Sequence, residues 1–253
     1  GLHHILNQLI RFTPIGGSAM IDGEQISGAL NIFNQLLMTS NPDMDIMRQA
    51  TRFLTQGTHP FMVFGLPAAC FAMYQTALPQ NKKKVKGMLL AAGLTSFFTG
   101  ITEPIEFAFF FISPLLWLFH AFMAGMSFLL NTLLGVCIGN AGGGLVDLLL
   151  FGVLRGTETK WIINVAIGII YAIIYYLVFK WAIVKFNIKT PGREDEDDEI
   201  NMIDEITELG TAIMSALGGK ENIVEIDNCI SRLRLILKDT SLVDEVASHK
   251  ATG

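Results

Sequence analysis

The chain has 253 residues, of which 51% are hydrophobic and only 16% are charged, and its formal net charge is −5. Ordinary soluble domains carry about 25% charged residues, so this composition excludes an ordinary soluble domain and indicates a protein that lies largely in a bilayer. The three cysteines, Cys70, Cys137 and Cys229, are far apart and form no CxxC pair, which favours neither a disulfide scaffold nor a zinc site. The sequence opens without the basic and apolar regions of a signal peptide, and we expect none.

In the first sixty residues, turn-forming residues repeatedly interrupt the apolar ones. Gly16-Gly17, Asp22-Gly23 and Asn41-Pro42 are the clearest of these signals. The pattern predicts hairpins and short helices here, and no complete membrane span.

Two later runs are long and apolar enough to cross a bilayer. Residues 61–78 end at Pro79, and residues 161–184 contain a tryptophan near each end. A span of about 20 residues matches the roughly 30 Å of hydrocarbon in a membrane. Basic residues follow both runs, and the positive-inside tendency therefore places those ends in the cytoplasm. These residues are Lys82, Lys83, Lys84 and Lys86 after the first run, and Lys185, Lys189 and Arg193 after the second.

Between these runs, residues 87–138 stay apolar for far more than one span, but prolines and ionisable residues interrupt them. A stretch that contains Glu103-Pro104 and Glu106 is not one plain helix, and backbone that leaves the helix at membrane depth must be buried in protein or line a water-filled space. The pattern predicts broken or re-entrant helices around a cavity. A loop is expected at residues 139–144 (GNAGGG).

Glu103 and Glu106 are the candidates for a binding role in this stretch. An acid at the centre of a membrane helix costs about 2.5 to 3.5 kcal/mol, and such acids usually serve function. A carboxylate accepts hydrogen bonds from sugar hydroxyls and can take the proton of a hydroxyl that attacks a phosphate. For Glu106 a purely structural partner is an equal alternative, whereas Glu103, beside the helix-breaking Pro104, is the better candidate.

The histidines carry a weaker signal. No further His or carboxylate ligands at fixed spacing accompany His3 and His4, so we expect no metal site. From spacing alone, a surface or hydrogen-bonded pair is favoured over a binding pair. The same interpretation applies to His59 and His120.

After Thr190 the composition changes abruptly. Pro191-Gly192 ends the helical pattern, and residues 194–199 are six acids in a row. A block of like charges repels itself and stays solvated, so it predicts a linker.

The last fifty residues predict a small α+β domain. Apolar residues at helical spacing indicate one amphipathic helix over residues 205–216, ended by Gly218-Gly219. Residues 222–226 and 230–237 are typical of two β-strands, with the turn between them at residues 227–229.

Cys229, in that predicted turn, is the candidate for covalent chemistry. Alternation along the second strand places Arg232 and Arg234 on one face. Guanidinium groups beside a thiol favour the reactive thiolate, and they bind phosphate oxygens with two parallel hydrogen bonds. These residues predict a thiophosphate carrier, while the alternative, which is commoner for a free cysteine, is a small buried hydrophobic side chain.

Taken in order, the motifs resemble a known family, the bacterial phosphoenolpyruvate-dependent phosphotransferase system. Four segments are similar to the IIC membrane component of its glucose, maltose and N-acetylglucosamine group: residues 1–4 (GLHH), 64–69 (FGLPAA), 100–107 (GITEPIEF) and 189–195 (KTPGRED). Two more resemble the IIB domain around its phosphorylated cysteine: residues 218–223 (GGKENI) and 227–234 (DNCISRLR).

The resemblance implies that Cys229 accepts phosphate from the phosphohistidine of a IIA partner and passes it to a sugar. Arg232 and Arg234 would stabilise that phosphate. Asn228 stands where many relatives carry alanine, a departure that casts little doubt on the cysteine. A carrier thiol argues against the rival hypothesis, a sugar-sensing membrane regulator of the same fold without phosphotransfer.

In the membrane part, the resemblance implies that Glu103, with Thr102 beside it, contacts the sugar and helps to deprotonate the accepting hydroxyl. A histidine of the GLHH motif would bind alongside, either His3 or His4, with His4 preferred. Glucose or an α-glucoside such as maltose is the preferred substrate.

The expected fold class is mostly α, with polytopic membrane helices that include re-entrant or broken ones, followed by the start of a small α+β domain. Residues 1–190 would form the C-terminal part of the IIC domain, residues 191–205 the acidic linker and residues 206–253 the first part of IIB. We expect the protein in the cell membrane, with its IIB part cytoplasmic. The implied partners are IIA, the sugar, membrane lipid and a second copy through IIC, without nucleic acid, cofactor or metal. Because family members have further helices before the GLHH motif and a longer IIB, this stretch alone is expected neither to transport nor to phosphorylate.

Overall fold

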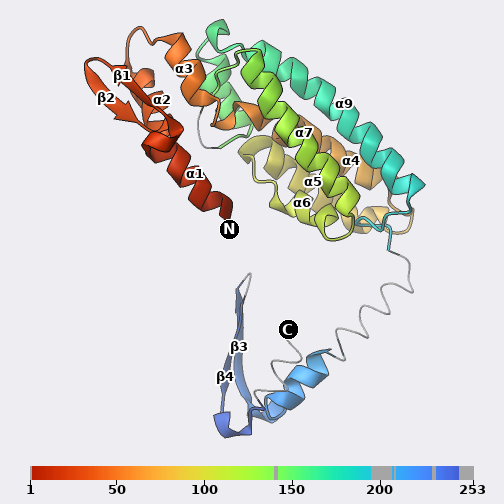
Figure 1. Ribbon diagram of the computed structural model, residues 1–253. Helices are drawn as coiled ribbons and strands as arrows, with labels where there is room; N and C mark the ends of the chain where they lie inside the picture. Colours follow the sequence, from red (N-terminus) through yellow and green to blue (C-terminus); the bar gives the residue numbers. More distant parts are fainter. Residues whose placement is uncertain (1, 140–141, 195–206, 208, 230–231, 245–253) are drawn as a thin grey trace. The chain divides into compact units, whose positions relative to one another are not determined.

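The structure is a computed structural model that describes residues 2–139, 142–194, 207, 209–229 and 232–244, with side chains for these except residues 2–4 and 227–234 (Figure 1). The chain divides into two compact units, Gly1–Arg193 and Glu194–Gly253. The first unit reaches past the predicted domain end at residue 190. There, Arg193 Nη1 donates to the Thr76 carbonyl at 2.8 Å, and the Leu78 amide donates to the Gly192 carbonyl at 2.8 Å.

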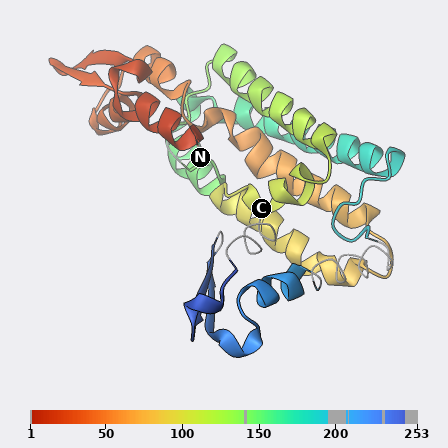
Figure 2. The ribbon, with the colours of Figure 1, turned by 60° about the horizontal axis from the view of Figure 1, so that its bottom comes forward.

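The N-terminal part of the first unit consists of short elements gathered at one end of the longer helices (Figures 1 and 2). Asp22 and Gly23, with φ values of 52° and 87°, join the two strands of a hairpin, as a two-residue turn with positive φ at both central positions requires. The prediction of hairpins and short helices is therefore confirmed. The elements are α1 (Leu2–Phe12), a 3-10 helix (Pro14–Gly16), β1 (Ser18–Ile21), β2 (Glu24–Ser27), α2 (Ala29–Met38), α3 (Met44–Thr51) and a 3-10 helix (Thr55–Gly57).

The rest of the first unit is a bundle of longer helices with short breaks. Its elements are a π-helix (Pro60–Gly65) that continues into α4 (Leu66–Thr76), then α5 (Lys82–Thr99), α6 (Glu103–Phe110), α7 (Pro114–Leu133), α8 (Leu145–Asp147), a second π-helix (Leu148–Val153), a 3-10 helix (Thr157–Thr159) and α9 (Trp161–Lys185). The predicted interruption of residues 87–138 is confirmed. Gly100, in the left-handed conformation, ends α5, and the Ser113 side chain caps α7 by accepting from the Leu116 amide at 3.3 Å.

Two of the described helices, α7 and α9, are long and apolar enough to cross a membrane. Their outward faces are apolar as well: Leu118, Phe122, Ile170 and Leu177 are all more than half exposed. Helices that are apolar all round belong in the core of a large protein or in a bilayer, and these outward faces are not covered within the unit. The inner faces pack around fully buried aromatic rings, with the Phe109 and Phe179 centroids 5.1 Å apart.

Close packing of α9 on the first π-helix depends on a glycine. A Cβ atom at Gly168 would lie 2.3 Å from Cδ2 and 2.6 Å from Cε2 of Phe64. We expect Gly168→Ala to destabilise the membrane unit by about 1–3 kcal/mol, because overpacking forces the ring and backbone to shift. The measurement is the thermal midpoint of the parent protein in detergent.

The matched control is Gly87→Ala in α5, where a Cβ would meet nothing within 4 Å. This variant should leave the midpoint unchanged or raise it slightly, since alanine is the better helix former. Equal midpoints for the two variants would show that Phe64 moves aside without cost.

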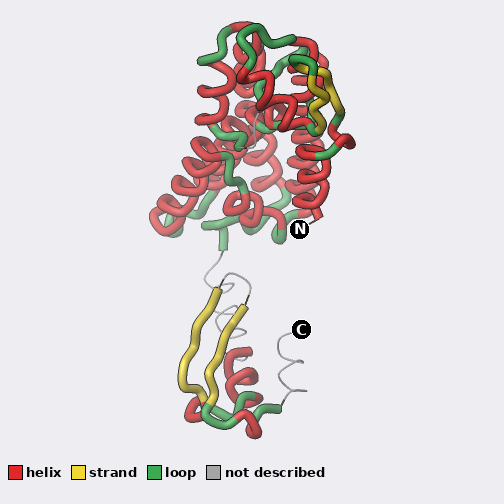
Figure 3. Tube along the Cα trace, turned by 90° about the vertical axis from the view of Figure 1, so that its left-hand side faces the viewer, coloured by secondary structure: helices red, strands yellow, loops and turns green. Residues whose placement is uncertain are grey.

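The described residues of the second unit form a helix, two strands and two short 3-10 turns. Residues 207 and 209–216 are helical. The strands β3 (Ile223–Cys229) and β4 (Arg232–Leu237) pair antiparallel, from Ile223 opposite Leu237 to Cys229 opposite Arg232, with a bulge between Ile223 and Glu225 (Figure 3). The 3-10 turns are Lys220–Asn222 and Thr240–Leu242. The predicted helix and strand pair are confirmed among the described residues.

Asn222 holds the base of this hairpin. Its buried side chain donates to the carbonyls of Leu217 and Asp239 at 2.8 Å each, and its Oδ1 accepts from the Asp239 amide at 2.8 Å. One side chain therefore joins the end of the helix to the start of β3 and the end of β4, which lie together at the base of the hairpin.

We expect Asn222→Ala to destabilise the second unit by about 1–3 kcal/mol, because it leaves buried backbone groups without partners. Hydrogen exchange of the full chain should accelerate in residues 223–226 and 235–237 and stay unchanged in α9. Asn222→Asp, which keeps the acceptor, should show a smaller effect, and the exposed neighbour variant Glu221→Ala should show almost none. Unchanged strand exchange in Asn222→Ala would contradict this role.

Candidate functional site

Two of the predicted sugar-contacting residues, Thr102 and Glu103, lie at the junction between α5 and α6. Thr102 is 7% exposed, and its carbonyl accepts from the amides of Ile105 and Glu106 at 3.0 Å each. Glu103 is the first residue of α6 and is exposed, and among the described residues its carboxylate has no ion-pair partner. This exposed carboxylate lies at the N-terminal end of α6, a position that favours a negative charge.

A glycine-rich loop packs backbone to backbone against this turn. A Cβ at Gly100 would lie 2.8 Å from the Gly144 nitrogen and 2.9 Å from the Gly142 carbonyl oxygen, and a Cβ at Gly144 would lie 2.4 Å from the Phe98 carbonyl oxygen. Only glycine permits such contact on both sides. We call Gly100, Gly142, Gly143 and Gly144 the glycine junction.

Asp147 fixes the loop side of the glycine junction. Its Oδ2 accepts from the amides of Gly142 at 2.8 Å and Gly143 at 3.0 Å. The loop at residues 139–144 was predicted, but this role of Asp147 was missed. An acid shortly after a glycine-rich stretch is the signal that could have indicated it, since a carboxylate readily accepts from consecutive exposed amides.

A third segment also reaches the glycine junction. A Cβ at Gly143 would lie 2.6 Å from Thr58 Oγ1 and 3.0 Å from Met62 Sδ. The segments around residues 58–62 and 142–144 therefore meet at the turn of residues 100–103, which carries Glu103.

Glu106 belongs to a different environment from Glu103. Its Oε1 lies 3.3 Å from Nε2 of His120 in α7, and Nδ1 of His120 lies 2.9 Å from the hydroxyl of Tyr175 in α9. His120 is 6% exposed and packs edge-on against Phe61 at 5.5 Å. The sequence analysis gave a purely structural role for Glu106 as an equal alternative, and His120 is the partner that this role requires. Glu106 thereby connects α6 to α7 directly, and to α9 through His120.

A set of buried amides lies deeper in the first unit and was missed by the sequence analysis. Asn164 Nδ2 donates to the Gln56 carbonyl at 2.8 Å and to Asn131 Oδ1 at 2.7 Å, and Asn131 Nδ2 donates to the Ser127 carbonyl at 2.8 Å. Asn131 lies in α7 and Asn164 in α9. An amide within an apolar, membrane-length helix is the signal that could have found them, since such a group needs a partner. His59 is also fully buried, and within the described residues neither ring nitrogen meets a hydrogen-bond partner.

The predicted phosphate carrier lies in the hairpin of the second unit. The strand register places Cys229 opposite Arg232 and Asp227 opposite Arg234. Paired positions, and positions two apart, share one face of an antiparallel ladder, so these four positions lie on one face of the hairpin. The side chains of all four lie outside the described part.

One detail of the prediction was wrong. Cys229 was expected in the turn between the strands, but it is the last residue of β3, because the pairing with β4 continues as far as Arg232. Residues 230 and 231, predicted to begin the second strand, lie outside the described residues.

His3 and His4 lie in the first turn of α1, and their side chains are outside the described part. The helix itself packs against α2 and the 3-10 helix Pro14–Gly16. The pairing of either histidine with Glu103 stays a prediction.

Within the described residues, no group of three His, Cys, Asp or Glu side chains is placed to hold a metal ion. Cys70 and Cys137 are free and buried in the first unit.

Comparisons with known proteins agree with the two units. Residues 1–125 match the family model for phosphotransferase system EIIC, and residues 211–244 match the one for phosphotransferase system EIIB. The chain is also similar to the phosphotransferase system maltose-specific EIICB component of Escherichia coli (strain K12), with 44% identity over 264 residues that cover 100% of this chain and 49% of that protein. The chain therefore spans about half the length of the curated relative it matches.

The helical unit, with its membrane-length helices, contains the part that matches EIIC, and the hairpin unit contains the part that matches EIIB. The chain belongs to the EIIC–EIIB components of the phosphotransferase system, which confirms the resemblance of its motifs.

Proposed function

We propose that the protein couples sugar uptake to sugar phosphorylation, with Cys229 as the phosphate carrier. The observation that carries this proposal is the register of the hairpin, which places Cys229 and Asp227 opposite Arg232 and Arg234 within the segment that matches EIIB. Two guanidinium groups at these positions suit the binding of a phosphate on a thiol. The same chain contains the permease unit that would supply the acceptor.

The first transfer forms a phosphorus–sulfur bond. The Cys229 thiolate attacks the phosphorus of a phosphohistidine on IIA, the phosphorus–nitrogen bond breaks, and the histidine ring keeps the electron pair. Arg232 and Arg234 would balance the negative charge on the equatorial oxygens during this step.

The second transfer delivers phosphate to the sugar. A sugar hydroxyl attacks the phosphorus, the phosphorus–sulfur bond breaks and the thiolate of Cys229 is restored. We assign Glu103 to accept the hydroxyl proton, with Thr102 beside it and His4, or alternatively His3, as a further contact to the sugar. The exposed position of Glu103 at the start of α6 supports its assignment as the proton acceptor. Such a site acts mainly by positioning and charge stabilisation.

The proposed substrate is a glucose-type sugar, with maltose first. The relative from E. coli is named maltose-specific, and the motifs alone favour glucose or maltose. We also propose IIA as the phosphate donor and a homodimer that forms through the IIC part. Residues 1–190 are the proposed IIC domain, residues 191–205 the linker and residues 206–253 the first part of IIB.

The test is sugar phosphorylation by membranes that contain the parent protein, supplied with the phosphorylated general carriers and IIA. A panel of hexoses and disaccharides would include glucose, maltose and N-acetylglucosamine. Phosphorylation of maltose or glucose supports the proposal. Sugar binding without phosphorylation of any sugar would favour the alternative, a sugar-sensing membrane regulator of the same fold.

A further inference from the structure

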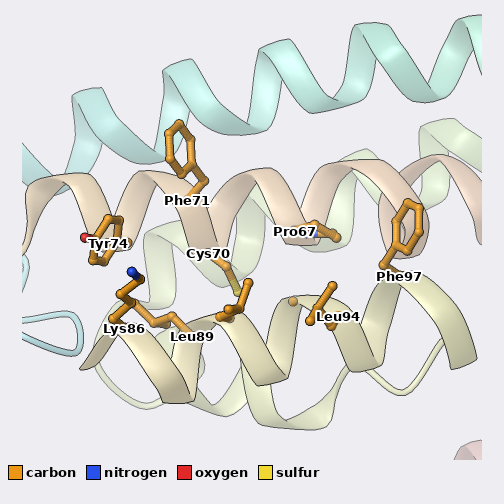
Figure 4. A pocket seen from close by; sticks show the side chains of 10 residues that line it. Pro67, Cys70, Phe71, Tyr74, Lys86, Leu89, Leu94 and Phe97 are labelled. Carbon is orange, nitrogen blue, oxygen red and sulfur yellow. The ribbon is translucent and has the colours of Figure 1, made fainter. Parts of the chain in front are cut away.

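A narrow groove runs along the first unit between α4 and α5 (Figure 4). It encloses about 390 Å³ and is lined mostly by apolar and aromatic side chains, with Cys70 and Phe71 from α4 and Leu90 and Leu94 from α5 among them. Among the described residues that line it, Lys86 alone is charged. Because it offers almost no hydrogen-bonding groups, this groove suits a hydrocarbon and does not suit a sugar.

The length of the groove corresponds to one leaflet of a bilayer. Its lining on α5 extends from Lys86 to Phe97, which corresponds to about 16 Å at the rise of an α-helix. This is about half of the roughly 30 Å hydrocarbon thickness of a membrane. An extended acyl chain from one side of the membrane would therefore run along the groove and end near the middle of the bilayer.

The lysine end of the groove is the cytoplasmic end. Lys86 follows Lys82, Lys83 and Lys84 on α5, a basic cluster of the kind that marks cytoplasmic ends. The chain also leaves the membrane unit toward EIIB here, since Arg193 is bonded to the Thr76 carbonyl at the end of α4. Lys82 Nζ lies 5.8 Å from the ring centroid of Tyr74, which itself lines the groove. Tyrosine and lysine together are typical of the membrane interface.

The floor of the groove is open because of a glycine. A Cβ at Gly93 would lie 3.7 Å from Cys70 Cβ and 3.9 Å from Cys70 Sγ. These are ordinary contact distances, so the position has space for a larger side chain that would fill the groove. The rims remain uncovered within the unit: Leu90 is 57% and Leu94 is 46% exposed.

We propose that this groove binds one acyl chain of an anionic phospholipid from the cytoplasmic leaflet, with the phosphate of the headgroup at Lys86. The charge complementarity favours this occupant. Basic pockets between membrane helices on the cytoplasmic side are suited to anionic headgroups. Among the described residues that line the groove there is no acid to pair with Lys86, so the lining itself leaves the positive charge for an anionic group.

The first experiment measures lipid retention. The full-length parent protein, wild type or variant, is purified in mild detergent from membranes that contain phosphatidylglycerol and phosphatidylethanolamine, and the bound lipid is identified by native mass spectrometry. Wild type should retain phosphatidylglycerol in preference to phosphatidylethanolamine. Lys86→Gln should weaken this retention about fivefold, the effect of one lysine beside an anionic surface, and Gly93→Leu should abolish it.

Matched controls come from the same helix. Lys83→Gln removes an exposed lysine that does not line the groove, and Gly87→Leu adds the same side chain at a position with nothing within 4 Å of its Cβ. Both should retain lipid like wild type. Equal retention of the two phospholipids by wild type, or full retention by Gly93→Leu, would overturn the proposal.

The second experiment identifies the occupant directly. A photo-crosslinking benzophenone residue replaces Leu90 in the full-length protein in native membranes. A crosslink to phospholipid, lost on adding Gly93→Leu, supports the proposal. A crosslink to a second copy, or to another segment of the same protein, would overturn it, because the groove would then be a protein interface. Both readouts are independent of sugar phosphorylation, so the lipid proposal and the proposed function can fail separately.

Discussion

Cys229→Ser is expected to lower sugar phosphorylation by the parent protein by roughly 10³-fold or more, because the covalent carrier step is lost. Serine has nearly the same size, so sugar binding by the membrane unit should persist. The measurement is transfer of labelled phosphate from phosphorylated IIA, followed both on the protein and on the sugar. Neither should become labelled in the variant.

Cys70→Ser and Cys137→Ser are the controls, since both of these cysteines are buried in the first unit. Each should still pass phosphate to the sugar, even where burial of a hydroxyl lowers its stability. If Cys229→Ser phosphorylates sugar at the wild-type rate, another residue is the carrier and the proposed mechanism is wrong.

Glu103→Gln and Glu106→Gln are expected to have different effects although they lie three residues apart on α6. Glu103→Gln should lower sugar phosphorylation by about 10²–10⁴-fold, the usual contribution of a general base, while labelled phosphate still accumulates on Cys229. The amide keeps the size of the side chain but cannot accept the proton. The two products, phosphorylated protein and phosphorylated sugar, are measured separately.

Glu106→Gln should act on stability instead. Its carboxylate lies 3.3 Å from His120, and loss of a charged partner costs about 1–3 kcal/mol. The thermal midpoint of the parent protein in detergent should fall, while sugar binding remains. If Glu106→Gln abolished transfer at unchanged stability and Glu103→Gln did not, the roles assigned to the two acids would be exchanged.

The elements that the sequence predicted well are those that local patterns determine. The helix α9 follows from one long, mostly apolar run, and the break between α5 and α6 follows from Glu103-Pro104. The turn at Asp22-Gly23 was equally clear, because its backbone conformation favours those residues.

What the sequence could not supply were the partners across the fold. Nothing near Glu106 in the chain indicates that His120 and Tyr175 meet it, and nothing near Asn131 indicates Asn164. These pairings depend on how the helices pack, which single-residue patterns do not encode. The extent of β3 through Cys229 was misjudged for a similar reason: ladder pairing with β4 outweighed the turn preference of Asp227 and Asn228.

The sequence predicted individual residues of the candidate site, but it did not predict which segments pack together around them. Cys229, Arg232 and Glu103 were identified from chemistry and resemblance, and their catalytic roles stay predictions. The glycine junction was invisible, because a glycine-rich loop does not reveal which backbone it will touch.

The glycine junction also restricts how the permease can move. The turn that carries Glu103 packs directly on the loop held by Asp147, so we expect these two segments to move together. A hinge that served the proposed sugar transport would then lie outside this pair of segments. Gly135, with φ of 70° just after α7, and the extended Ser113 just before it, are positions where the backbone can absorb such a rotation.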